Sequence, residues 1–172
     1  MIKSVSSWDP EFFKEFISIS QRFYLDHTDY IKESMDDFEN MLSNKAPFNQ
    51  RNNWKAWIIV ENNLVLGRVF ASTRTDEFKQ QEFLPFGYFE AENEQTAHML
   101  FKCVEEFSAE VGYKTIRGPI DGNVFNSSRF TMFQSKRRFL GEPLHRPEYL
   151  SYFHGAGFNV SQTWISAFFS FK

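Results

Sequence analysis

The chain has 172 residues, 42% of them apolar and 24% charged, with a net charge of −3 and an isoelectric point near 5.8. This length and composition predict a single folded domain over residues 1–172 and exclude intrinsic disorder. The acidic balance argues against general nucleic-acid binding, and no apolar run approaches the roughly 18 residues that span a bilayer. No basic end followed by an apolar stretch opens the chain, so we read no signal peptide and expect a cytoplasmic protein without membrane or nucleic-acid partners.

The first third of the chain predicts one short strand and two helices. Residues 2–5 are the strand candidate, and Asp9-Pro10 supplies an N-cap followed by proline at the first helical position. A second helix is expected from Thr28 to about Ser43. Apolar residues recur at helical spacing in both helices: Phe12, Phe13, Phe16, Ile17, Phe23 and Tyr24 in the first, and Ile31, Met35, Phe38 and Leu42 in the second.

The middle of the chain predicts three strands and the clearest helix. Residues 54–60 and 64–72 are apolar or β-branched runs joined by Glu61-Asn62-Asn63, a pattern typical of a hairpin. Residues 83–91 are the third strand candidate, with Gly87 inside it as a bulge. The helix that follows is capped by Asn93 and ended by Gly112, and its inner face is expected to hold Ala97, Leu100, Cys103 or Val104, Phe107 and Val111.

The last third predicts two strands, a short helix and a long irregular segment. Residues 115–120 form a short strand, residues 147–156 the helix and residues 160–171 the last strand. Because a helix separates the strands at 83–91 and 115–120, a parallel crossover can join them. The order β-α-α-β-β-β-α-β-irregular-α-β predicts an α/β (α+β) fold, in which helices flank a mixed, mostly antiparallel central sheet.

The irregular segment, residues 121–146, combines positive charge with aromatic side chains. Its five cations (Arg129, Lys136, Arg137, Arg138 and Arg146) face two acids (Asp121 and Glu142), for a net charge of +3. It also holds Phe125, Phe130, Phe133 and Phe139, which make it too apolar for a free linker. We predict a packed flap, called the basic flap below, with a hairpin near residues 129–133 and cations that meet phosphates or an anionic acceptor. A solvated turn at residues 136–138 is the alternative.

Several segments resemble the GNAT superfamily of N-acetyltransferases in sequence as well as in order. Residues 64–69 resemble the family's third-strand pattern, and residues 110–116 resemble the exit of its central helix into the fifth strand. Residues 149–158 resemble the short helix before the sixth strand. A bacterial subgroup with GP…N and YNPxYY-like motifs is similar in Arg117-Gly118-Pro119, Asn126 and Pro147-Glu148-Tyr149.

The resemblance implies an acyl-CoA-dependent N-acyltransferase. In this family an amine, here a small-molecule or protein amine, attacks the thioester of acetyl-CoA or another acyl-CoA directly. The pantetheine arm lies between the fourth and fifth strands and pairs with the fourth-strand backbone, and the pyrophosphate sits on the N-terminus of the following helix. Carried over to this sequence, the cofactor-binding residues are Gly87, Tyr88, Phe89, Gln95, Thr96, Ala97, Asn126 and Arg146.

The resemblance also implies a general base and an acid. Glu90, on the strand that lines the acceptor pocket, is expected to act as the base directly or through water. The family's usual tyrosine falls on Phe153, which cannot donate a proton, so Tyr149 and His145 are the candidates to replace it. The alternatives are a solvated strand carboxylate for Glu90, helix packing for Tyr149 and a solvated loop position for His145.

Other positions depart from the family pattern. In the pyrophosphate motif only Ala97 matches, whereas Glu92 and Gln95 replace a cation or amide and a glycine. A non-catalytic GNAT-fold module for ligand binding or interaction is therefore the alternative function. No metal is expected, because the histidines lack ligand spacing and Cys103 is the single cysteine. The family's seventh strand has no room at the C-terminus, so residues 129–133, a second copy in a homodimer or a continuation of the chain would take its place.

Overall fold

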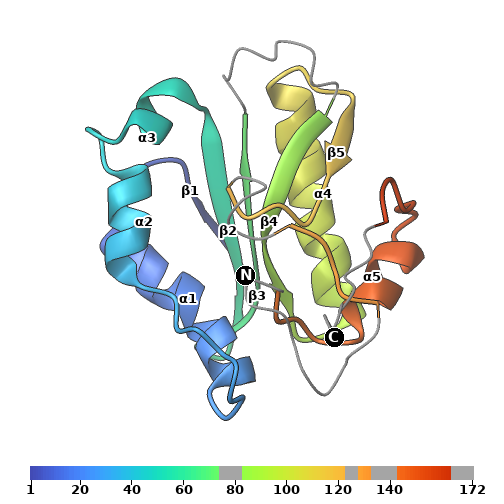
Figure 1. The fold of residues 1–172 in the computed structure, drawn as a ribbon. Coiled ribbons are helices and arrows are strands. Elements are labelled where there is room, and N and C mark those ends of the chain that lie inside the picture. Colours follow the sequence, from blue (N-terminus) through green and yellow to red (C-terminus); the bar gives the residue numbers. More distant parts are fainter. Residues whose placement is uncertain (74–82, 123–127, 133–142, 164–172) are drawn as a thin grey trace, which may run out of the picture.

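The computed structural model describes residues 1–73, 83–122, 128–132 and 143–163. A central sheet with helices on both of its faces is the main feature of these residues (Figure 1). In spatial order the strands are β1 (Ile2–Val5), β2 (Trp54–Glu61), β3 (Leu64–Ser72), β4 (Phe83–Ala91) and β5 (Thr115–Arg117). The helices are α1 (Pro10–Tyr24), α2 (Met35–Leu42), α3 (Pro47–Arg51), α4 (Glu94–Glu110) and α5 (Tyr149–Gly155). Figure 1 places α1, α2 and α3 on one side of the sheet and α4 and α5 on the other.

The pairing of the strands confirms the predicted α/β fold with a mixed, mostly antiparallel sheet. Strands β1 to β4 pair antiparallel, and β5 joins β4 in parallel through the crossover helix α4. The parallel pairing covers Phe83–Pro85 opposite Thr115–Arg117 and is followed by one bond from the Ile120 amide to the Phe86 carbonyl, at 2.7 Å. Residues 87–91 of β4 extend beyond this point with no paired strand on that side among the described residues. The side of β4 beyond its pairing with β5 is called the gap between β4 and β5 below.

A bulge in β4 sets which side chains point to which face of the sheet. Arg68 pairs with Glu90 and Phe70 pairs with Gly87, so two steps along β3 match three steps along β4. Tyr88 lies inside this bulge and has a positive φ of 47°. The predicted bulge at Gly87 is thus confirmed. It directs both Tyr88 and Glu90 to the face covered by α1, where Tyr88 packs in the apolar cluster and Glu90 reaches a tyrosine of the helix.

The face covered by α1 and α2 is filled largely by aromatic rings. Phe13 and Phe16 on α1 are completely buried, and their ring centroids lie 5.4 Å apart. Phe38 on α2 packs 5.1 Å from Phe13. These contacts place Phe13, Phe16 and Phe38 on the inner faces of their helices, as predicted. They also account for part of the high phenylalanine content, because each ring buries a large apolar surface against the sheet.

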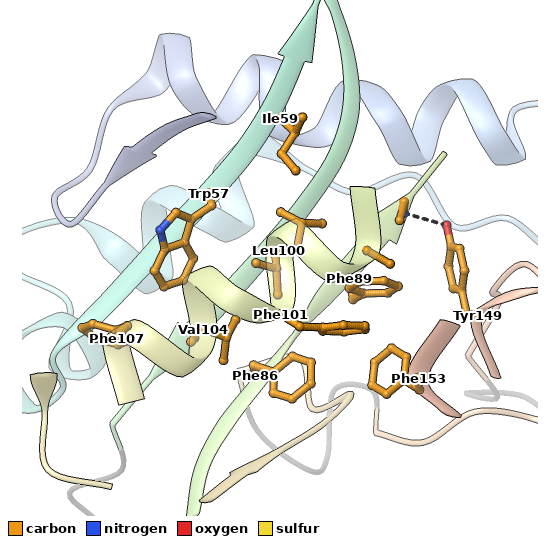
Figure 2. Packing of buried hydrophobic residues seen from close by; sticks show 14 of the residues in the cluster. Trp57, Ile59, Phe86, Phe89, Leu100, Phe101, Val104, Phe107, Tyr149 and Phe153 are labelled. Carbon is orange, nitrogen blue, oxygen red and sulfur yellow. Dashed lines mark hydrogen bonds between the residues drawn. The ribbon is translucent and has the colours of Figure 1, made fainter. Parts of the chain in front are cut away.

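The face covered by α4 and α5 holds a second aromatic cluster, drawn in Figure 2. Phe101 of α4 stacks on Phe89 of β4 at 5.2 Å and meets Phe153 of α5 edge-on at 4.7 Å. On the same face of α4, Val104 is fully buried, whereas Cys103 is only half-buried, which decides between the two predicted core positions. This cluster fixes α5 against the end of β4.

The second predicted helix begins later than the periodicity indicated. Residues 25–34 form an irregular connection, called the α1–α2 connection below, and α2 starts only at Met35. Ser34 is its N-cap, with an extended backbone and a hydroxyl that accepts a bond from the Asp36 amide. The expected buried position of Ile31 was wrong, since its side chain is 80% exposed. Ser34, an N-cap residue inside the periodic run, sets the start of the helix at Met35.

Three smaller differences concern the rest of the chain. The short helix α3 was not predicted, and β5 ends at Arg117 instead of continuing to Ile120, which makes an isolated bridge with Ser128. A last strand was expected at residues 160–171. Residues 160–163 are not in a strand, and residues 164–171 lie outside the described residues. No helix in the described parts of the chain is both long and apolar enough to cross a membrane.

Candidate functional site

A buried carboxylate lies near the end of β4, beyond the residues that pair with β5. Glu90 is only 5% exposed, although it stands near the end of a strand. Its Oε2 accepts one hydrogen bond from the hydroxyl of Tyr24 at 2.8 Å and another from the hydroxyl of Tyr149 at 2.5 Å. Tyr24 is the last residue of α1 and Tyr149 the first of α5, so Glu90 is held from both faces of the sheet.

A guanidinium on the neighbouring strand completes the surroundings of Glu90. Arg68 of β3 lies with one terminal nitrogen 3.6 Å from Oε1 of Glu90. Its two terminal nitrogens donate to the two oxygens of Glu33, at 2.7 and 2.9 Å, in a bidentate ion pair. Glu33 in turn accepts a 2.6 Å bond from the hydroxyl of Ser20. One buried cation is therefore shared by two carboxylates, and one of them belongs to the α1–α2 connection.

Burial changes the protonation of this cluster. Loss of hydration raises the pKa of Glu90 to about 7, against the charge of Arg68 and the hydrogen bonds of Tyr149 and Tyr24, which lower it. The pKa values of Tyr24 and Tyr149 are also raised, first by burial and then by the charge of Glu90. Both tyrosines therefore keep their protons at neutral pH and act as donors, while Glu90 titrates in the neutral range. Such a carboxyl is suited to exchange protons near pH 7.

The hydroxyl of Tyr149 also closes the edge of β4. It accepts a 3.1 Å bond from the amide of Ala91, drawn as the dashed line in Figure 2. The guanidinium of Arg146 donates to the carbonyls of Ala91 and Glu92, both at 3.3 Å. Side chains from the segment before α5 and from its first residue thus occupy the amide and the carbonyl of Ala91, at the end of β4. Sequence reasoning placed Tyr149 and Arg146 near the site but did not predict these contacts.

The N-terminus of α4 begins directly after this edge. Asn93 caps the helix as predicted, and its side-chain oxygen accepts from the Thr96 amide at 2.9 Å. Thr96 and Ala97 are buried against the sheet, whereas Gln95 is exposed. The carboxylate of Glu92 makes a 2.7 Å ion pair with Arg22 of α1. Of the residues predicted for phosphate binding, Gln95 is thus the one in this turn whose side chain is open to solvent.

Two guanidiniums gather around one ring near this turn. The guanidinium carbons of Arg22 and Arg146 each lie 4.7 Å from the ring centroid of Phe23. Arg146 also approaches Glu148 at 3.5 Å, and its side chain is 26% exposed. Cation–π contact and the β4 carbonyls hold Arg146 beside the start of α4, in a position to meet an anion.

The remaining predicted cofactor residues on β4 lie along the bulge. A side chain at Gly87 would come within 2.2 Å of the Ile120 carbonyl oxygen, so the close passage of the neighbouring chain requires a glycine here. The Tyr88 amide donates to the Asp121 carboxylate, and Phe89 points into the cluster below α4. Asn126 lies outside the described residues.

His145 is oriented by backbone groups. Its Nε2 accepts a 2.7 Å bond from the Thr131 amide, which leaves Nδ1 to carry the proton toward the Arg146 carbonyl at 3.0 Å. Its ring is 4.9 Å from that of Phe130 and is nearly buried. The solvated loop position considered for His145 is therefore wrong. Phe130 also packs 4.8 Å from Phe153, so this residue of the basic flap is packed against α5, whereas Arg129 and Met132 are exposed. Lys136, Arg137 and Arg138 lie outside the described residues.

A cleft of about 800 Å³ opens on the other side of α5. It runs between Thr115–Ile120 and the residues of α5 and its exit, and Phe153 lies in its wall. Phe153 follows Tyr149 by one helical turn, and the rings of both residues pack 5.1 Å from that of Phe89. Among the described residues, no group of three or more His, Cys, Asp or Glu side chains could hold a metal ion.

Sequence reasoning missed three members of the cluster, namely Tyr24, Arg68 and Glu33. Tyr24 was assigned to the apolar face of the first helix, and Glu33 was not among the predicted site residues. Only Arg68 carried a usable signal: a single charged residue inside an apolar strand, which needs a buried partner.

Known structures share this architecture at low sequence identity. An aminoglycoside acetyltransferase from an uncultured soil metagenomic sample, solved with sisomicin, aligns over 100% of this chain and 96% of its own with a TM-score of 0.60 and 9% identity. An aminoglycoside N-acetyltransferase solved with CoA aligns over 99% of both chains, with a TM-score of 0.55 and 10% identity. A predicted acetyltransferase from Clostridium acetobutylicum, solved with acetyl-CoA, covers 97% and 96%, with a TM-score of 0.52 and 16% identity. No protein-family model and no curated protein sequence matches the chain.

The chain has a GNAT-like fold. The fold inferred from sequence motifs is thereby confirmed. In this GNAT-like fold, the Glu90 cluster lies beside the gap between β4 and β5, and the capped N-terminus of α4 follows directly along the chain.

Proposed function

We propose that the protein is an acyl-CoA-dependent N-acyltransferase that transfers an acetyl group from acetyl-CoA to an amine. The observation that carries this proposal is the pair of Glu90 and Tyr149 beside the gap between β4 and β5. A carboxyl with a pKa of about 7 is bonded there to a tyrosine that keeps its proton. The GNAT-like fold supports the same reaction class, since the similar structures named above are acetyltransferases.

In the proposed reaction the amine nitrogen attacks the carbonyl carbon of the thioester, so that a C–N bond forms and the C–S bond breaks. Glu90 takes the proton that the nitrogen loses, directly or through a water molecule. Tyr149 gives its proton to the leaving thiolate. The proton on Glu90 then returns to Tyr149 along their 2.5 Å hydrogen bond, and both groups regain their starting state.

Acetyl-CoA would bind along the open edge of β4 and the start of α4. Pairing of the pantetheine arm with the Ala91 amide and carbonyl requires that Tyr149 and Arg146 release those groups. Arg146 would then be free to meet a phosphate, together with Gln95 and the N-terminus of α4. His145 would orient the loop that carries Arg146 instead of supplying a proton, because both of its ring nitrogens face backbone groups. The acceptor would be a small-molecule amine, by analogy with the neighbour that was solved with sisomicin.

Release of the CoA thiol from acetyl-CoA in the presence of a mixture of primary amines tests this proposal. We expect amine-dependent thiol release by the wild-type protein and a rate at least about 100-fold lower for Glu90→Gln. Glu39→Gln, which changes an exposed acid on α2, is the matched control and should retain the wild-type rate. Equal rates for the wild-type protein and Glu90→Gln would contradict the role of Glu90.

A second candidate, a non-catalytic GNAT-fold module for ligand binding or interaction, is favoured by a specific observation. The β4 edge groups are already occupied by Tyr149 and Arg146, and Phe153 stands where the family has a proton donor. Such a module would either bind CoA without turnover or not bind it at all. Thiol release that depends on an added amine would exclude this alternative.

A further inference from the structure

The buried cluster contains one cation and two carboxylates, and the cation is shared unequally. Both short contacts of Arg68 go to Glu33, while its distance to Glu90, 3.6 Å, is longer than a normal hydrogen bond. The side chains of Arg68 and Glu90 are only 3% and 7% exposed, whereas that of Glu33 is 22% exposed. The more accessible carboxylate therefore holds the guanidinium, and the more buried one is left with the weaker contact.

We propose that Arg68 is a positioning residue for Glu90 and that Glu33, by holding Arg68, sets how strongly it stabilises the charged form of Glu90. This inference rests on the proposed function in assigning Glu90 as the base, although its test does not depend on turnover.

The geometry explains why the two carboxylates compete. A guanidinium has five N–H donors in a rigid plane, and the bidentate pair with Glu33 fixes that plane. Arg68 also donates to the Phe16 carbonyl at 3.3 Å, and its buried Nε has no hydrogen-bond partner among the described residues. Loss of the Glu33 charge would therefore loosen the hold on both terminal nitrogens. One of them also donates to the Phe16 carbonyl, and the other is the nitrogen that lies 3.6 Å from Oε1 of Glu90 and is placed to move closer to it. In a buried site a closer cation stabilises the carboxylate strongly.

Other groups around Glu90 do not have this variable role. Tyr24 from α1 and Tyr149 from α5 both donate to Glu90 and stay protonated. Asp121, which follows β5, raises the pKa of Arg68 through its charge, and its carboxylate accepts a hydrogen bond from the Tyr88 amide. Glu33 is the one carboxylate of the cluster placed on an irregular connection, so a shift of the α1–α2 connection and the ionisation of Glu90 are coupled through Arg68.

The connection is itself tied to α1 at this point. The hydroxyl of Ser20 on α1 donates a hydrogen bond to Glu33 at 2.6 Å and accepts one from the hydroxyl of Tyr30 at 3.3 Å. Leu25 and Ile31, both in this connection, are 72% and 80% exposed. Few apolar contacts therefore hold these positions, and the ion pair with Arg68 is a main attachment of the connection to the sheet.

A carboxyl titration by NMR tests the inference. The protein is labelled with ¹³C at the glutamate carboxyl carbons, and Glu90→Gln identifies the Glu90 signal. We expect a midpoint near 7 in the wild-type protein and a midpoint lower by about one pH unit or more in Glu33→Gln. Glu39→Gln, the matched control, should leave it within a few tenths of a unit. Glu33→Asp keeps the charge and should hold the midpoint closer to the wild-type value.

Three results would overturn the inference: an unchanged midpoint in Glu33→Gln, a raised midpoint, or an equal shift in Glu33→Asp. Amide spectra should be recorded for each variant to check that it is folded. Arg68→Lys provides a second test of the inference. Lysine keeps the charge but has no planar fork to hold both carboxylates, so Glu33→Gln should shift the Glu90 midpoint less in this background than in the wild-type protein, because only the direct charge of Glu33 then acts on Glu90. If acyl transfer fails while the midpoint shifts as expected, only the proposed function is lost. If an active enzyme shows no shift, only this inference is lost.

Discussion

The hydroxyl of Tyr149 donates a 2.5 Å hydrogen bond to the Glu90 carboxylate and accepts one of 3.1 Å from the Ala91 amide. A side chain of α5 thus reaches past the edge of the sheet to a carboxylate that faces α1. The two helices lie on opposite faces of the sheet (Figure 1), so this hydroxyl links α5 to the carboxylate that α1 also contacts through Tyr24.

Removal of the Tyr149 hydroxyl should destabilise the protein. Tyr149→Phe leaves the Ala91 amide and one Glu90 oxygen without this partner in a fully buried site, which should cost about 1–3 kcal/mol of unfolding free energy. Tyr152→Phe removes a hydroxyl from the same helix at a more exposed position and should change the unfolding free energy by less than about 0.5 kcal/mol. Urea unfolding followed by circular dichroism measures both. An equal, small effect would show that the Tyr149 bonds contribute no stability.

The stability of the protein should fall as the pH rises from about 4.5 to about 7. Glu90 has a pKa raised from its ordinary value of 4.5 to about 7 in the folded state. Between these values the folded protein binds the extra proton, so the contribution of Glu90 is greatest below 4.5 and is lost as the pH passes 7. The loss amounts to roughly 3 kcal/mol.

Glu90→Gln provides the comparison for this pH dependence. The glutamine cannot titrate, so the difference in unfolding free energy between the wild-type protein and the variant should change with pH over that window and be constant above it. Urea titrations at several pH values give this difference. A difference that does not vary with pH would contradict a raised pKa.

Gly67 should not tolerate a larger side chain. A Cβ at this position of β3 would lie 2.5 Å from Cγ2 of Thr96 and 3.0 Å from Cδ1 of Leu100, where α4 packs on the sheet. Gly67→Ala should therefore destabilise the protein by about 1–3 kcal/mol. Gly155→Ala in α5 is the matched control, because its Cβ would meet only the flexible end of Glu94 closely. Thermal unfolding of the two variants should separate them, and equal melting temperatures would contradict the tight α4 packing.

Arg146 should contribute to the affinity for acetyl-CoA through charge. Arg146→Ala is expected to weaken binding about tenfold at low salt, and the difference from the wild-type protein should shrink as salt is added. Arg51→Ala removes an exposed charge on α3, away from β4, and serves as the control. Affinities at two salt concentrations measure the effect. An unchanged affinity for Arg146→Ala would remove this residue from the cofactor site.

Local signals predicted most of the fold, because the chemistry that ends each element lies within a few residues of it. Asn93 and the positive-φ Gly112 bound α4, and Asn62 and Asn63 adopt positive φ in the predicted hairpin. Gly87 correctly indicated the bulge in β4. The structure adds the reason for a glycine there, which is the close passage of the Ile120 backbone after β5.

The buried cluster could not be predicted in the same way. Its bonds join residues far apart in the sequence, such as Arg68 with Glu33 and Tyr24 with Glu90. Periodicity indicates which face of a helix is apolar, but it does not show that the tyrosine at the end of α1 meets a carboxylate on β4. The irregular α1–α2 connection was missed for the same reason. Apolar periodicity alone predicted a helix that included Ile31, whereas the helix in the structure begins at Met35.

Calorimetric titration of the protein with acetyl-CoA tests the proposed function most directly. We expect saturable heat with about one site per chain, competition by CoA and weaker binding by Arg146→Ala. The absence of both heat and a shift in melting temperature at millimolar acetyl-CoA would contradict it.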